Sequence, residues 1–127
     1  MADTTVTDIN TIARTGSSSS KYDRSLTAAS DGTAVASTDV AVIPNYNPKT
    51  DTLLLCVSAA SPTVTVSVNT SNTAGRTNDM TWTAATGTMN VIPPGALPAS
   101  LFTQDAGTLR LSVASGNIYV TVLRCAA

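Results

Sequence analysis

The class of fold is decided by residues 53–68, which read LLLCVSAASPTVTVSV. Apolar residues recur at every second position on both sides of the loop at 59–62, and this alternation is typical of strands with one buried face. A hairpin with Val57 opposite Val64 brings six apolar residues to one face, and a slip of one residue would scramble both faces. Its pairs are Val57/Val64, Leu55/Val66 and Leu53/Val68, with Leu54/Ser67, Cys56/Thr65 and Ser58/Thr63 on the other face.

A second stretch, residues 109–122, has the same character and reads LRLSVASGNIYVTV. A two-residue turn at Ser115-Gly116 predicts another hairpin. Its pairs are Val113/Ile118, Leu111/Val120 and Leu109/Val122, with Arg110/Thr121 and Ser112/Tyr119 outside. Further strands are predicted over 33–43, 80–84 and 88–92. The sequence therefore predicts an all-β fold, a small antiparallel β-sandwich or jelly-roll-like domain over 31–127.

Composition supports this fold class and excludes several kinds of chemistry. The 127 residues, the size of one domain, include 22 Thr, 14 Ser and 12 Val, but no Glu and no His. Without His, a Ser-His-Asp triad, a Cys-His pair and a His-containing metal site are excluded. A net charge of −1 with seven basic residues argues against a nucleic-acid groove. We therefore expect neither an enzyme nor a cofactor or metal site.

Residues 1–30 differ from the rest and are expected to form an extended N-terminal arm. They contain the run Ser17–Ser20 and little sustained periodicity. Val6, Ile9 and Ile12 recur at a spacing of three, which would suit one or two helical turns as well as an extended arm. Such an arm would lie against neighbouring chains or against its own domain, and the sequence leaves both open.

The middle of the chain is nearly free of charge. Between Thr52 and Gln104 only Arg76 and Asp79 are charged. A face of Thr, Ser, Ala and Leu suits packing on protein, although a neutral Thr-rich face in contact with water is the alternative. Two connections exceed hairpin length, at 69–79 and 93–106. The second carries the apolar residues Leu97, Leu101 and Phe102.

Other motifs are weak. Ser18-x-x-Lys21 matches the nucleophile motif of penicillin-recognising enzymes, but it lies in a serine run and lacks its companion motifs. The side chains of Asn45, Asn47 and Asp51 could converge on a calcium ion in one turn. The alternative is a plain Asn/Pro turn without a metal. Trp82 and Tyr119 could stack on a sugar, or belong to the core.

Targeting and redox signals are equally sparse. We see no secretory signal and no membrane span, and the only two cysteines, Cys56 and Cys125, are expected to be reduced and buried.

Taken together, the Thr-rich sandwich, the N-terminal arm and the charge-poor face resemble the small capsid decoration (cement) proteins of tailed bacteriophages. The resemblance is one of overall style and is carried by no family motif. It implies a structural protein on the outer capsid surface of the virion, made in the host cytoplasm. There it would bridge neighbouring subunits of the major capsid protein, commonly as a homotrimer. As a hypothesis, Val6, Ile9 and Ile12 anchor the arm, while Leu97, Leu101 and Phe102 pack against a sister chain.

Two other functions remain open. One is a glycan- or receptor-binding module of a phage fibre or a bacterial adhesin, using the loop at 69–79 with Trp82 or Tyr119. The other is a different head or tail subunit of the same virion, which the sequence does not separate from decoration.

Overall fold

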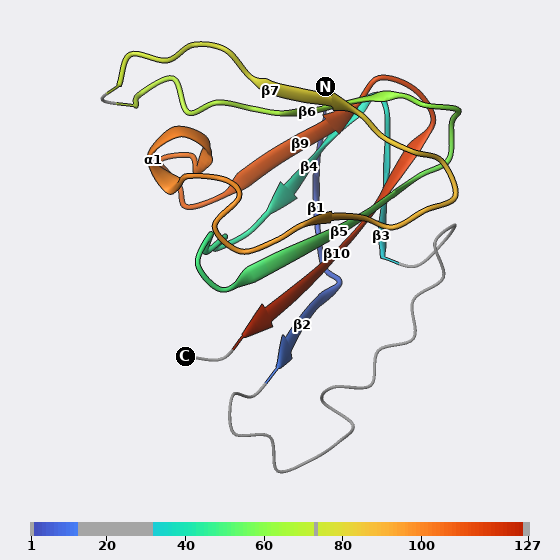
Figure 1. Ribbon diagram of the computed structural model, residues 1–127, viewed down its shortest axis with the longest axis horizontal. Coiled ribbons are helices and arrows are strands. Elements are labelled where there is room, and N and C mark those ends of the chain that lie inside the picture. Colours follow the sequence, from blue (N-terminus) through green and yellow to red (C-terminus); the bar gives the residue numbers. More distant parts are fainter. Residues whose placement is uncertain (1, 13–31, 73, 126–127) are drawn as a thin grey trace.

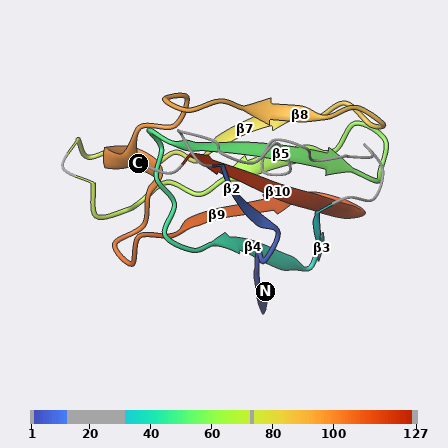
Figure 2. The same cartoon turned by 90° about the horizontal axis from the view of Figure 1, so that it is seen from below.

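The computed structural model describes residues 2–12, 32–72 and 74–125, with the backbone alone at 10–12 and 125. Its strands form two sheets (Figures 1 and 2). Sheet 1 runs in the order β1 (Ala2–Thr5), β4 (Asp39–Ile43), β9 (Leu109–Val113), β6 (Thr63–Val66), β7 (Met80–Thr83). Sheet 2 runs in the order β2 (Ile9–Ile12), β10 (Asn117–Cys125), β5 (Asp51–Val57), β8 (Asn90–Ile92), and β3 (Thr33–Ala36) also pairs with β10. One short helix, α1 (Ala99–Phe102), lies between β8 and β9 in the chain.

The order of the strands is that of a jelly roll. From β3 to β10 the chain changes sheet at every connection except the one between β6 and β7. All pairs among these eight strands are antiparallel. The predicted small all-β sandwich is therefore confirmed, and of its two forms the structure has the jelly roll.

Both predicted hairpins are wrong as pairings. β5 pairs with β10 and β8, whereas β6 pairs with β7 and β9. Val57 is thus opposite Ile118, and Val64 is opposite Val113. The strand predicted over 33–43 is likewise divided at Ser37-Thr38 into β3 and β4, which belong to different sheets. Each of these turns carries the chain over the core, and inward-facing residues alternate in the same way whether a turn stays in one sheet or changes sheet.

The predicted faces, by contrast, are confirmed. The twelve apolar residues assigned to the inner faces of the two hairpins are all at most 6% exposed. They are Leu53, Leu55, Val57, Val64, Val66, Val68, Leu109, Leu111, Val113, Ile118, Val120 and Val122. Most of them form the core together with Val35, Ala41, Ile43 and Leu97. On the opposite face of β5, Leu54 and Cys56 are buried as well.

The described part of the predicted arm belongs to the sandwich. β1 pairs in parallel with β4, and β2 pairs in parallel with β10, so the segment adds one strand to each sheet. Val6 lies between the two strands, is 1% exposed and donates its backbone N–H to Val42. The boundary placed at residue 30 therefore does not separate an arm from the domain, because Val6 completes the core. Of the two forms considered, residues 2–12 take the extended one; the serine run and Lys21 lie outside the described residues.

The two cysteines are too far apart to bridge. Cys56 is opposite Tyr119 on β10, and Cys125 is six residues further along the same strand. At about 3.3 Å per residue this is roughly 20 Å, while a disulfide needs Cα atoms within about 7 Å. The Cys56 thiol is buried, with Sγ 3.4 Å from the Met89 sulfur. No helix in the described ranges is long and apolar enough to cross a bilayer.

Candidate functional site

Charged side chains are sparse on one side of the sandwich, where Arg76 and Asp79, in the connection before β7, are the only charges between residues 52 and 104. Strands β6, β7 and β8 carry none, whereas β1, β4, β9 and β10 carry Asp3, Asp39, Arg110 and Arg124. Figure 2 places β7 and β8 along the top and β4 with the N-terminus at the bottom. The charge-poor stretch of sequence thus becomes one side of the molecule, because the jelly-roll order puts β7 and β8 at the same ends of the two sheets.

The charged side is held by ion pairs. Arg110 on β9 donates to both carboxylate oxygens of Asp3 on β1, at 3.1 and 2.6 Å. These hydrogen bonds hold the pKa of Asp3 below its ordinary value. Since the Asp3 side chain is 53% exposed and that of Arg110 is 32% exposed, water screens the pair, and it orients β1 more than it stabilises the fold.

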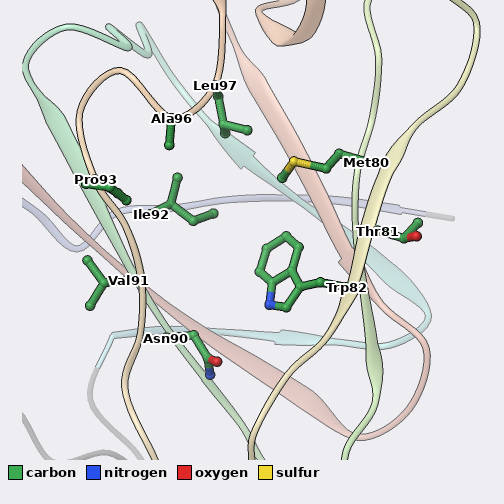
Figure 3. Close-up of a pocket in the computed structure, with 9 residues that line it drawn as sticks. All are labelled: Met80, Thr81, Trp82, Asn90, Val91, Ile92, Pro93, Ala96 and Leu97. Atoms are coloured by element: carbon green, nitrogen blue, oxygen red, sulfur yellow. The ribbon is translucent and has the colours of Figure 1, made fainter.

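Between β7 and β8 the sandwich opens into a pocket of about 340 Å³. We call this opening the mouth (Figure 3). Its lining consists of residues from β7, β8 and the segment after β8, which are Met80, Thr81, Trp82, Asn90, Val91, Ile92, Pro93, Ala96 and Leu97. The volume is at the lower end of the range that small-molecule sites occupy. None of the nine is ionisable in the ordinary pH range, so the mouth is suited to binding and offers no acid–base chemistry.

Strand register determines which side chains enter the mouth. Trp82 is opposite Val64 and Met80 is opposite Val66, so both share the inward face of sheet 1 with these buried valines. On β8, Ile92 is opposite Leu53, which is buried in the core, and therefore points inward too. Val91 points outward and is 55% exposed. Because no strand covers β7 or β8 on its free side within the described residues, the inward side chains of both edges remain accessible.

The two long connections are joined to each other by hydrogen bonds. The backbone N–H of Asn69 donates to Leu101 at 2.6 Å, and its side-chain amide donates to Thr103 at 2.9 Å and to Asp105 at 3.0 Å. Gln104 donates from its amide to Ser67 at 3.2 Å. These bonds join the segment after β6 to the segment after β8, and they hold Leu97 and α1 against the core.

The residues predicted to meet a partner have different positions. Val6 and Leu97 are each 1% exposed and pack inside this chain's own core, whereas the prediction assigned them to an anchoring arm and to a contact with a sister chain. Ile9 and Phe102 are half-buried and pack against the core, and Leu101 is half-buried on α1. The side chain of Ile12 lies outside the described ones. Leu97, Leu101 and Phe102 share one segment, but only Leu97 lines the mouth.

The aromatic pair considered for sugar binding is not brought together. Trp82 points between the sheets, whereas Tyr119 is opposite Cys56 and lies on the outer face of sheet 2. In Figure 3 the indole nitrogen of Trp82 is turned toward Asn90. Asn90 donates from its amide nitrogen to the carbonyls of Leu55 and Ala85, at 3.2 and 3.4 Å, and its side-chain oxygen faces Trp82. This end of the mouth therefore presents one donor and one acceptor.

Asp51, considered for calcium, is instead paired with an arginine. It is fully buried, and its carboxylate accepts two hydrogen bonds from Arg124, both 2.9 Å long. It also accepts the backbone N–H of Asn47 at 3.0 Å, so the Asp51 carboxylate fixes the turn at 44–48 as well. Within the described residues no cluster of acidic or cysteine side chains could hold a metal ion. Burial, and to a smaller extent the negative charge of Asp51, raises the pKa of the nearby Tyr46 to about 12.

Sequence reasoning missed most of the mouth. Met80, Asn90 and Ile92 were placed on predicted strands, but nothing local indicated that these strands would be the free edges of two facing sheets. The signal available was the low charge of residues 52–104, which did mark this side of the molecule.

Comparison of the chain with protein-family models, with curated proteins and with solved structures finds no match.

Proposed function

We propose that this protein is a structural component of a bacteriophage virion, which decorates the outer capsid surface and stabilises it by bridging neighbouring subunits of the major capsid protein. The observation that carries the proposal is the charge-poor side formed by β6, β7 and β8, with its open mouth and two strand edges that no other described strand pairs with. A neutral surface with a free strand edge favours packing on another protein. The unpaired backbone N–H and C=O groups of the edge can bond to a second polypeptide, and no charged side chain has to be desolvated.

The fold is in keeping with this role. Single jelly rolls recur in viral capsid proteins and in lectins, so the topology supports both a virion subunit and a glycan-binding module by analogy. The lining of the mouth favours the first, since most of its residues are apolar and a sugar ring needs several hydrogen-bonding groups around it.

Decoration also needs many weak contacts to act together. A homotrimer would present three such sides to the capsid, and linked contacts raise the apparent affinity without any new interaction. Of the three residues expected to pack against a sister chain, Leu101 and Phe102 are half-buried on α1. They therefore keep exposed apolar surface for such a contact.

The direct test is co-sedimentation of the purified chain with capsids of its virus that lack it. We expect saturable binding, with a higher melting temperature of the decorated capsids. Light scattering on a sizing column should give about three times the mass of 12.9 kDa. Deletion of residues 1–30 is unsuitable as a control, because it removes Val6 from the core. Leu101→Asp is the better variant, since it changes the surface of α1 and leaves the core intact; it should yield a folded monomer with weaker capsid binding.

A glycan-binding module is the second candidate, supported by the accessible indole of Trp82 at the mouth. Glycan-array binding by a monomer, lost in Trp82→Leu without loss of fold, would favour it. Absence of capsid binding together with such a signal would replace the first proposal by this one.

A further inference from the structure

The two free edges at the mouth determine what could occupy it. β7 pairs only with β6, and β8 pairs only with β5, among the strands of the described residues. The bond from the N–H of Ala84 to the carbonyl of Pro62 fixes the alternation along β7. In an antiparallel pair, every second residue turns its backbone groups toward the partner strand. Trp82 and Met80 therefore face β6, and Thr81 and Thr83 direct their N–H and C=O groups outward.

A strand added beside Thr81 and Thr83 would lie over the mouth. Its side chains would alternate between the two faces of sheet 1, as in any strand. Every second one would enter the space between the sheets, where Met80, Trp82 and Ile92 already point (Figure 3). At about 340 Å³ the pocket has ample room for an apolar side chain, and the nearby donor of Trp82 and acceptor of Asn90 match a peptide group.

We propose that the mouth binds an extended, uncharged segment of a partner polypeptide, which adds as a strand to the free edge of β7 and inserts one apolar side chain into the pocket. This deepens the proposed function, on which it rests, by naming the contact through which the protein would hold its capsid partner. The segment is uncharged because strands β6, β7 and β8 carry no charged side chain to pair with it, and the nearest charges in the sequence, Asp79 and Arg76, lie in the connection before β7 and do not line the pocket. Backbone bonds would supply affinity and the pocket would supply specificity.

Trp82 provides the measurement. It is the only tryptophan of the chain and it lines the pocket, so its fluorescence reports directly on occupancy. The probes are blocked heptapeptides, Ac-Ser-Thr-Thr-Xaa-Thr-Thr-Ser-NH2, with Leu, Ile, Met, Ala, Asp or Lys at Xaa. We expect a saturable blue shift with Leu, Ile or Met, binding weaker by about tenfold or more with Ala, and none with Asp or Lys. N-methylation of the two residues beside Xaa should abolish binding, because it removes the backbone donors.

One variant tests the pocket and another tests the strand edge, and a third serves as the control. Ala96→Phe fills the pocket from an exposed position and should raise the dissociation constant more than about tenfold, while Ala114→Phe, exposed in the β9–β10 turn, should not change it. Thr81→Pro removes an outward N–H that β6 does not use, and is expected to abolish binding without unfolding the chain. Circular dichroism and unfolding midpoints verify the fold of each variant.

The outcomes are distinct. Absence of a blue shift with every peptide overturns the proposal, as does equal binding of the N-methylated peptides. Dimerisation that is lost in Ala96→Phe, with no peptide response, would assign the mouth to contacts between copies and also overturn it. Capsid co-sedimentation distinguishes failure of the strand contact from failure of the proposed decoration. Capsid binding that survives in Ala96→Phe leaves decoration standing and rejects the contact at the mouth. Peptide binding without capsid binding supports the contact and rejects decoration.

Discussion

Val113 and Ile118 are five residues apart and lie in different sheets: Val113 is opposite Val64 in sheet 1, and Ile118 is opposite Val57 in sheet 2. The turn between them carries the chain over the core instead of folding it back on itself. Both residues are at most 3% exposed, so they meet through side chains in the core and share no ladder of backbone hydrogen bonds.

This arrangement predicts which engineered cysteines will cross-link. Thr65 is opposite Ser112 across β6 and β9, and both side chains point out of sheet 1. In a Thr65→Cys, Ser112→Cys variant we expect an oxidised bridge, because directly opposed Cα atoms lie about 5.5 Å apart. A Ser112→Cys, Tyr119→Cys variant, which a β9–β10 hairpin would bridge, should form no bridge; it is made in a Cys56→Ser background, because position 119 is directly opposite Cys56. Mass mapping of the bridges is the measurement, and a bridge in the second variant alone would contradict the jelly roll.

The ion pair of Asp51 and Arg124 predicts a large loss of stability when it is broken. Arg124→Met would leave a fully buried carboxylate with its two strongest donors gone. Breaking a buried pair from one side typically costs about 3–5 kcal/mol, so the urea midpoint should fall steeply. Lys49→Met, which removes an exposed charge near the same turn, serves as the matched control and should change stability by less than about 0.5 kcal/mol.

The hydroxyl of Tyr46 predicts the behaviour at alkaline pH. Its oxygen is buried and has no hydrogen-bond partner in the described part of the chain. Burial raises the pKa of Tyr46 from 10.0 to about 12. The folded protein therefore holds this proton more tightly than the unfolded chain, and its contribution to stability is complete below pH 10 and is lost as the pH rises toward 12.

Tyr46→Phe should flatten this alkaline loss. At neutral pH it should leave stability unchanged or raise it by up to about 1 kcal/mol, because a buried unpaired hydroxyl is removed. Urea unfolding at pH 7 and above pH 10 measures both effects. A clear destabilisation at neutral pH would mean that the hydroxyl is satisfied after all.

Gly116 marks the close approach of two turns. Its φ is +68°, and a Cβ there would lie 2.7 Å from Ser58 Oγ and 2.9 Å from Ala59 Cβ. Gly87 has a similar φ of +75° with nothing within 4 Å. Both Gly→Ala variants incur about 1 kcal/mol of backbone strain, and we expect Gly116→Ala to lose a further ~1–3 kcal/mol through overpacking. Equal unfolding midpoints for the two variants would contradict this packing of the β5–β6 and β9–β10 turns.

Part of the candidate site followed from the sequence. The low charge of residues 52–104 marked the side on which the mouth lies, and the long connection after residue 92 was expected to carry apolar contacts. Leu97 in that connection was expected to pack against a sister chain, but it is 1% exposed and lies in the core of its own chain. Trp82 and Asn90 meet only because the ends of two different sheets coincide, which no local pattern specifies.

The sequence by itself determined the fold class and the inner face of each strand. Alternation is a local property: at Leu53, Leu55 and Val57 it fixes which side chains point inward, whichever strand lies beside them. The tertiary structure alone decided the pairing. A turn after Val57 or after Val113 satisfies the same alternation in a hairpin and in a crossing between sheets, and the choice depends on how all the inward faces fill one core. The place of Val6 in that core, the buried pair of Asp51 with Arg124 and the open mouth all follow from this choice.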